Sequence, residues 1–266
     1  MKYIYILISL ALLFACDGDE DGSKISDDFT NFIDAKSLRI YSKDDVSSGF
    51  LNNVGKSYEA MFTDNSNIDE SIRAHYLSTS KDEYVWQRVG LEASFYKNES
   101  YAEGFPPRPY RHNVTDYIWE MDTGGKDQIG EVIEHLLHTV TTVILYLAYP
   151  NEWDYNKSSS ALSLAMQEAI DKGIYDISSY EDIKNDEEAY NKVLTQEYAY
   201  WLILAEWDYY IVADKKRDGI SGNEEFIIGT PDEIESQLPL GHKLYKDYVE
   251  KVLSIPNKQK IVSLFP

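Results

Sequence analysis

DQIGEVIEHLLHTVTTVILYLAY, residues 127–149, is the stretch that decides the fold. Its apolar residues recur at intervals of three and four, which predicts one face of a helix held for about five turns. They are Ile129, Val132, Ile133, Leu136, Leu137, Val140, Val143, Ile144 and Leu147. At about 100° per residue, the side chains of Glu131, Glu134, His135 and His138 project from the opposite side. The stretch therefore predicts a core helix with two histidines and two carboxylates gathered on one patch.

The N-terminus has the pattern of a secretory signal. Lys2 precedes a mostly apolar run over residues 3–15, which is too short to span a bilayer. The run ends in Leu13-Phe14-Ala15-Cys16, which resembles the lipobox of bacterial lipoproteins. The resemblance implies that residues 1–15 are a signal peptide and that lipidated Cys16 anchors the chain to a membrane. An ordinary signal peptide or an unprocessed apolar start is the alternative.

Residues 16–30 are acidic and contain glycine, which predicts a solvated tether before a single domain over residues 31–266. Such acidic runs resemble those of surface-exposed lipoproteins of the Bacteroidetes type, so we expect a location in the bacterial cell envelope, with the outer-membrane surface as the candidate face. The formal net charge of −21 excludes nucleic acid and anionic membrane surfaces as partners. Cys16 is the single cysteine, so an intrachain disulfide is excluded.

The pattern of the remaining chain predicts an α+β fold, a helix-rich single domain with a small sheet in its first half. Residues 98–125 contain three prolines and form a loop long enough to favour a functional role. The predicted strands are residues 37–41, 75–77 and 84–89, with a strand-like segment at 226–228. Besides the central helix, helices are predicted at residues 46–62, 186–210 and 244–253. A further helix is predicted to begin at the N-caps Ser158, Ser159 and Ser160 and to end at Lys172.

The central helix contains the string Glu134-His135-Leu136-Leu137-His138. A catalytic zinc ion takes three protein ligands and leaves a fourth position for water. The usual helical motif is H-E-x-x-H, in which the glutamate is the general base. In the register of that motif, Glu134 and His138 take the two ligand positions and His135 takes the position of the base.

A third ligand is predicted in the helix at residues 186–210. Glu197 projects from the middle of its apolar face, which consists of Tyr190, Val193, Leu194, Trp201 and Leu204. A buried carboxylate costs several kcal/mol unless a cation, a donor or a proton satisfies it. A metal ion would satisfy Glu197, and so would a tyrosine or an arginine.

The order of these parts resembles the zincin fold of metallopeptidases, in particular the glutamate-liganded group that includes the anthrax lethal factor type. The resemblance covers residues 37–253 and rests on the E-H-x-x-H string and on Glu197-Tyr198-Ala199-Tyr200-Trp201. It implies that His138 and Glu197 are metal ligands and that Tyr210 or another late tyrosine donates to an oxyanion. The chain departs from the family because position 134 is glutamate and position 135 is histidine.

Three functions remain open at this point. The first is an unusual zinc-dependent hydrolase of peptides or proteins, in which Glu134, His138 and Glu197 hold the metal and His135 is the base. Two carboxylates and one histidine would also suit manganese or iron. The second is a metal site without hydrolysis, formed by His135 and His138 with Glu131 or Glu197. The third is a non-catalytic binding or structural lipoprotein of the envelope without metal. We expect His75, His112 and His242 to be structural or exposed.

Overall fold

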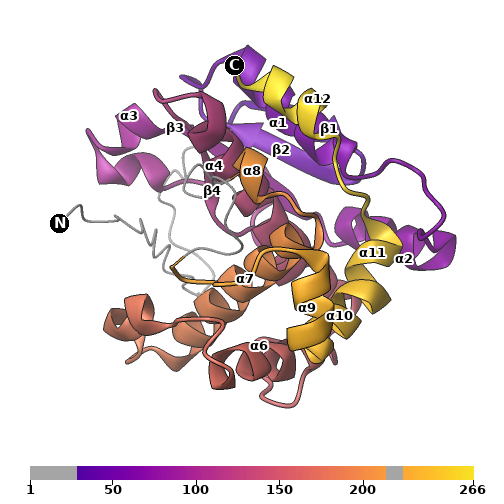
Figure 1. Cartoon of the computed structure of the whole chain (residues 1–266). Coiled ribbons are helices and arrows are strands. Elements are labelled where there is room, and N and C mark those ends of the chain that lie inside the picture. The colour runs from indigo at the N-terminus through magenta and orange to yellow at the C-terminus, as the bar shows by residue number, and fades with distance from the viewer. Residues whose placement is uncertain (1–28, 214–223) are drawn as a thin grey trace.

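The computed structural model describes residues 29–213 and 224–266. The predicted signal peptide, Cys16 and most of the predicted tether lie outside these residues. The described part is a helix-rich α+β fold with a small sheet in its first half, as predicted (Figure 1). Its helices are α1 (Ser48–Ala60), α2 (Glu70–Asp82), α3 (Glu92–Phe95), α4 (Gly125–His138), α5 (Tyr146–Ala148), α6 (Ala161–Asp171), α7 (Glu187–Glu206), α8 (Tyr210–Ala213), α9 (Pro231–Gln237), α10 (Pro239–Leu244), α11 (Glu250–Val252) and α12 (Lys258–Leu264). Short 3₁₀ segments are η1 (Glu99–Ala102) and η3 (Ser178–Ile183), and π-helical segments are η2 (Thr139–Leu145) and η4 (Tyr245–Val249).

The sheet has four strands in the order β1-β2-β3-β4. They are β1 (Asn31–Ala35), β2 (Leu38–Ser42), β3 (Trp86–Leu91) and β4 (Tyr117–Glu120). β1 and β2 form an antiparallel hairpin, whereas β2, β3 and β4 run parallel to one another. The parallel pairs need crossovers, and α1 and α2 supply the one between β2 and β3. In Figure 1 the sheet, α1 and α12 form one side of the molecule, and α6, α7, α9 and α10 form the other.

The central helix lies between these two sides (Figure 1). It runs without a break through α4, η2 and α5, and α4 contacts β4, α7 and α8. Each residue of the predicted apolar stripe is buried in the main core, except for Leu147, which is partly buried. The helix is long and apolar enough to cross a membrane, but 72% of its most apolar window is buried inside the fold. It is therefore the core helix that its sequence predicts.

Gly130 marks a close approach of α8 to the central helix. A Cβ atom at this position would lie 2.5 Å from the carbonyl oxygen of Ala213, at the end of α8. Only a residue without a side chain lets the backbone of α8 come so near. This contact fixes α8 against the first half of α4.

Side chains of α4 cover the outer edge of β4. The backbone N–H of Trp119 donates to Glu131 Oε1 at 2.8 Å. Gln128 donates to the carbonyl of Trp119 and accepts from the N–H of Met121, both at 2.8 Å. The backbone groups of an edge strand, which usually need water or another strand, are satisfied here by a helix.

The structure confirms most predicted elements and corrects two. The loop predicted at residues 98–125 contains η1 and the strand β4, so only part of it is irregular. β2, β3, α1, α6 and α7 fall at the predicted places, with Ser160 as the N-cap of α6. The strand predicted at residues 75–77 is wrong, because these residues lie inside α2. Asp69 caps α2 by accepting from the N–H groups of Ser71 and Ile72. The buried face of α2 consists of Arg73, Tyr76 and Ser80. Of the segment at 226–228, Phe226 forms an isolated bridge with Tyr175.

Candidate metal centre

Glu134, His138 and Glu197 meet where α4 packs against α7. One possible ligand atom from each of the three side chains lies within 4.8 Å of the other two. His138 Nε2 and Glu197 Oε1 are 3.6 Å apart. The two ligand positions of the helix string and the independently predicted third ligand therefore come together.

Asp116 fixes the orientation of His138, a role that sequence reasoning missed. Its Oδ2 atom lies 3.0 Å from His138 Nδ1 and accepts from Gln196 Nε2 at 2.6 Å. Gln196 in turn accepts from the hydroxyl of Thr115 at 3.0 Å. In the neutral ring with Nδ1–H donating to the carboxylate, Nε2 of His138 is the nitrogen that presents a lone pair, and it faces Glu197.

The backbone of Asp116 is also held in place. The buried side chain of Gln87 on β3 donates to the carbonyl oxygen of Asp116 at 2.7 Å. The same side chain accepts from the hydroxyl of Thr139, the first residue of η2. π-helical turns inside α-helices occur frequently at functional sites, and this one begins directly after His138. A chain of hydrogen bonds thus connects the sheet, Asp116 and the helix that carries His138.

The second ring nitrogen of His138 lacks a partner. The His138 side chain is 1% exposed, and among the described residues its Nε2 atom has no hydrogen-bond partner. Leaving a buried polar atom unsatisfied costs about 1–3 kcal/mol. The unsatisfied atom faces one of two carboxylates, which is the place where a cation would satisfy it.

The charges of the site shift the pKa values of its members. Burial, together with the nearby charge of Glu197, raises the pKa of Glu134 to about 8. Burial alone would lower the pKa of His138, but the carboxylates of Glu197 and Asp116 outweigh it and raise that pKa to about 9. Burial alone would raise the pKa of Asp116, yet its interactions with His135 and His138 hold that pKa well below its usual range. The charge of Glu197 thus acts on both Glu134 and His138.

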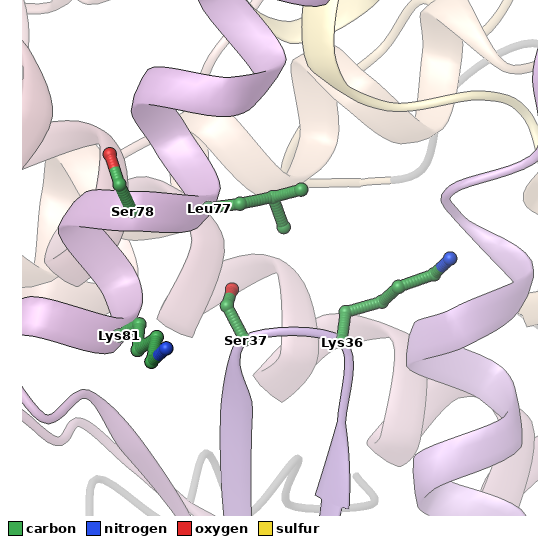
Figure 2. Close-up of a pocket in the computed structure, with 5 residues that line it drawn as sticks. All are labelled: Lys36, Ser37, Leu77, Ser78 and Lys81. Atoms are coloured by element: carbon green, nitrogen blue, oxygen red, sulfur yellow. The ribbon is translucent and has the colours of Figure 1, made fainter.

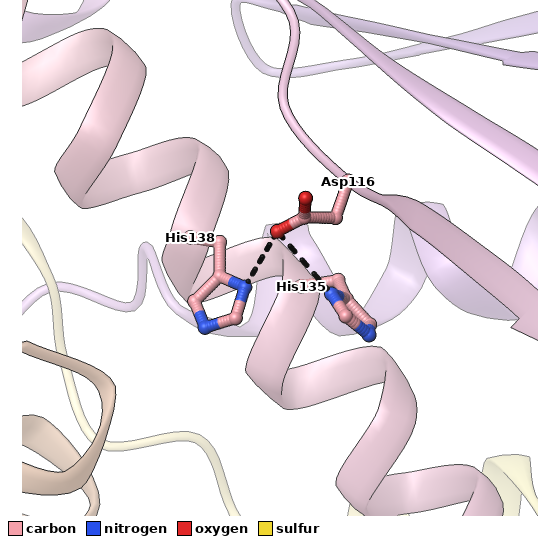
Figure 3. Close-up of side chains that lie close together, drawn as sticks. All are labelled: Asp116, His135 and His138. Atoms are coloured by element: carbon pink, nitrogen blue, oxygen red, sulfur yellow. Dashed lines mark hydrogen bonds and ion pairs between the residues drawn. The ribbon is translucent and has the colours of Figure 1, made fainter. Parts of the chain in front are cut away.

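His135 lies beside the group of three and is not one of its members. Its Nε2 atom is 3.3 Å from Glu131 Oε1, and its Nδ1 atom is 3.8 Å from Asp116 Oδ2. Figure 3 shows Asp116 directed at both rings, with one oxygen facing His135 and His138. Although burial lowers the pKa of His135, the surrounding carboxylates raise it well above the usual value. The role of His135 as a general base stays a prediction, and its surroundings favour the protonated ring.

Asp116, His135 and His138 form a second group with possible ligand atoms in range of one another. In this group Asp116 Oδ2 already accepts from Gln196 and contacts His138 Nδ1. A metal ion here would have to break both interactions. His135 Nδ1 in this group also has no hydrogen-bond partner among the described residues, but a metal ion held by Glu134, His138 and Glu197 would break no hydrogen bond of Asp116, so that group is the better candidate.

The other candidate residues lie apart from this centre. His75 Nε2 is 3.1 Å from the carbonyl oxygen of Ala148. His242 Nδ1 is 2.8 Å from Glu206 Oε1. The hydroxyl of Tyr210, which was predicted to donate to an oxyanion, lies 3.5 Å from the carbonyl oxygen of Ile228 and donates to it.

A shallow pocket of about 360 Å³ lies away from the metal centre, between the β1–β2 turn and α2. It is lined by Lys36, Ser37, Leu77, Ser78 and Lys81. Figure 2 shows the amino groups of Lys36 and Lys81 on opposite sides of the turn that carries Ser37. The two cations therefore do not converge on one anion.

Comparison with known proteins gives no relative: no family model, no curated protein and no solved structure matches the chain.

Proposed function

We propose that the chain is a cell-envelope lipoprotein, anchored through Cys16, whose folded part binds one divalent metal ion through Glu134, His138 and Glu197. One observation carries this proposal. The buried Nε2 atom of His138 has no hydrogen-bond partner in the described part of the chain and lies 3.6 Å from a carboxylate oxygen. Coordination to a metal would satisfy this atom and offset the like charges of Glu134 and Glu197.

The distance between His138 and Glu197 suits zinc. With bonds of about 2.0–2.2 Å, two ligands of a tetrahedral zinc ion lie about 3.4 Å apart. The distance of 3.6 Å between His138 and Glu197 is close to that value. Asp116 then plays the part of the carboxylate that commonly holds the other nitrogen of a ligating histidine. Because the set has two carboxylates, manganese and iron also suit it.

The first candidate activity is hydrolysis by a metallopeptidase-like centre. A bound zinc ion would polarise a carbonyl and lower the pKa of a water molecule at its fourth position. Glu134 and Glu197 are partly exposed, so water can reach the carboxylate side of the group. Asp116 orients the ring of His138. A neighbouring group must then accept the proton of the attacking water. In the predicted mechanism His135 is that group, and a peptide or protein is the substrate.

The second candidate is a non-catalytic binding or structural lipoprotein. The surroundings of His135 favour it, because a ring held protonated by Glu131 and Asp116 does not accept a proton at neutral pH. In this case the metal, if bound, would stabilise the fold. The resemblance to zincins would then concern architecture alone.

Elemental analysis tests metal binding. The protein should be purified without chelator and without a metal-affinity step, then analysed for zinc, manganese and iron. We expect about one equivalent of metal, lost in His138→Ala and kept in the matched control His75→Ala. Absence of metal, together with a melting temperature that chelator leaves unchanged, would overturn the proposal.

A peptide-library digest separates the two candidate activities. Cleavage by the metal-loaded protein that disappears in His138→Ala would establish the hydrolase. A metal-loaded protein that cleaves no peptide would favour the non-catalytic candidate. Replacement of the presumed base, His135→Gln, should then leave the metal content unchanged in both cases.

A further inference from the structure

A second pocket lies one helical turn from the metal centre. It has a volume of about 110 Å³ and sits where the segment before β4 meets η2, α5 and α7. Thr142 follows His138 by four residues, and Lys192 precedes Gln196 by four. The pocket is lined by His112, Asn113, Val114, Thr142, Val143, Tyr146, Leu147, Tyr155 and Lys192.

The charge of this lining is unusual for the chain. The sequence has 46 acidic and 25 basic residues, yet no acidic residue lines the pocket. Lys192 is the cation of this lining. The pocket therefore offers positive charge on a molecule that is otherwise strongly negative.

Lys192 has no counter-ion in its surroundings. It is partly buried, and within residues 29–213 and 224–266 its ammonium group forms no hydrogen bond or ion pair. The charges of Asp116 and Glu188 act on it from a distance, but Asp116 is committed to Gln196 and His138. Burial, with the charge of Arg88 in the same direction, lowers the pKa of Lys192. A half-buried cation without a partner is costly, and an anion in the pocket would offset this cost.

We propose that this pocket binds a carboxylate carried on a short apolar group, with Lys192 as the residue that pairs with it. Val114, Val143 and Leu147 supply an apolar wall for the attached carbons. A volume near 110 Å³ corresponds to roughly four water molecules at about 30 Å³ each, enough for a carboxylate and a few carbons. A small organic acid and the C-terminal residue of a peptide share the required chemistry.

This inference goes beyond the metal centre, and it can be tested on the metal-free protein. The probes are butyrate and its neutral analogue butyramide, and the readout is the methyl NMR signals of Val114, Val143 and Leu147. We expect saturable shifts of these signals with butyrate and none with butyramide. Equal shifts with both probes would overturn the proposal, because the carboxylate would then contribute nothing. Since chelated protein is used, the result does not depend on whether a metal binds.

Two substitutions of Lys192 identify the cation. Lys192→Met keeps the length of the side chain and should weaken butyrate binding at least about tenfold, whereas Lys192→Arg should keep binding within a few-fold. The matched control is Lys184→Met, which removes an equal charge from an exposed lysine paired with Glu181. Unchanged butyrate affinity in Lys192→Met, with undisturbed signals elsewhere as proof of folding, would overturn the assignment. So would displacement of butyrate by an equal concentration of inorganic phosphate.

A last comparison tells the two sources of the carboxylate apart. N-acetyl-alanyl-valine and its C-terminal amide should be titrated in the same way. Binding of the dipeptide acid and not of the amide would support the C-terminus of a peptide as the ligand. Binding of butyrate alone would support a small free acid.

Discussion

The carboxylate of Asp116 lies 3.0 Å from Nδ1 of His138 and leaves the opposite nitrogen of the ring facing Glu197. Asp116 comes from the segment before the sheet's last strand, and His138 is the last residue of α4. The relation between them determines which nitrogen of the histidine can serve as a ligand. Four predictions follow from this and other contacts of the described residues.

Asp116→Asn should weaken metal binding about 10- to 100-fold, the usual effect of removing a carboxylate behind a ligating histidine. Asparagine keeps the size of the side chain, so the fold should persist. Competition with a chromophoric chelator measures the affinity. Asp122→Asn, at an exposed site before α4, is the control and should bind metal as the unmodified protein does. Equal affinities of the two variants would contradict the role of Asp116.

Glu197→Gln should lower the melting temperature of the metal-loaded protein more than that of the chelated protein. The variant loses a ligand when metal is present, but in its absence it loses the like charge that acts on Glu134. Calorimetry with and without chelator gives both melting temperatures. Glu187→Gln, at an exposed position of α7, should change both temperatures by the same small amount. Equal shifts for Glu197→Gln in the two conditions would argue against a ligand role.

Gly130→Ala should reduce the free energy of unfolding by roughly 1–3 kcal/mol, the usual cost of overpacking, because the new Cβ atom meets the carbonyl oxygen of Ala213 at 2.5 Å. Urea denaturation measures the change. The matched control is Gly49→Ala in α1, where nothing lies within 4 Å of the added atom. There the same substitution should stabilise the helix by about 0.5–1 kcal/mol. A neutral Gly130→Ala would show that α8 does not pack as described.

Glu206 should make the stability depend on pH. Burial raises the pKa of its carboxyl group from 4.5 to about 7, despite the hydrogen bond with His242. The folded protein therefore holds a proton that the unfolded chain releases, and the resulting stability is full below pH 4.5 and is lost as the pH rises to about 7. Glu206→Gln removes this dependence, since glutamine stays neutral.

We expect the free energy of unfolding of Glu206→Gln, relative to the unmodified protein, to rise between pH 4.5 and pH 8. The upper limit is roughly 3 kcal/mol, from about 1.4 kcal/mol per unit of pKa. Urea titrations at several pH values measure it. Glu181→Gln, where the carboxylate is 60% exposed, should show a constant difference across the same range. A constant difference for Glu206→Gln as well would refute the prediction.

The central helix could be predicted because its apolar pattern is long and regular. Glu197 could be predicted as a candidate ligand because a carboxylate on an apolar helix face needs a partner. Asp116 was missed for a physical reason. It lies at the end of the proline-containing loop, where side-chain periodicity carries no signal, and directly before a strand of four residues. Its partner is 22 positions away, so no local pattern links them.

Two other features left no trace in the sequence pattern. Every residue of η2 is buried, so apolar residues there do not report which turn is π-helical. The segment at residues 75–77 fits a strand and a helix equally well because it is short. The N-cap Asp69 decides for the helix, and it lies six residues before that segment.

The covering of β4 by α4 has a consequence for any extended peptide that approaches the sheet. Addition of a strand to β4 would have to displace Glu131 from the N–H of Trp119, and Glu131 is the same carboxylate that faces His135. A peptide could therefore not pair with this edge without releasing the histidine. β1, at the other side of the sheet, is the edge that a further strand could join, and it lies on the hairpin farthest from the metal centre in strand order.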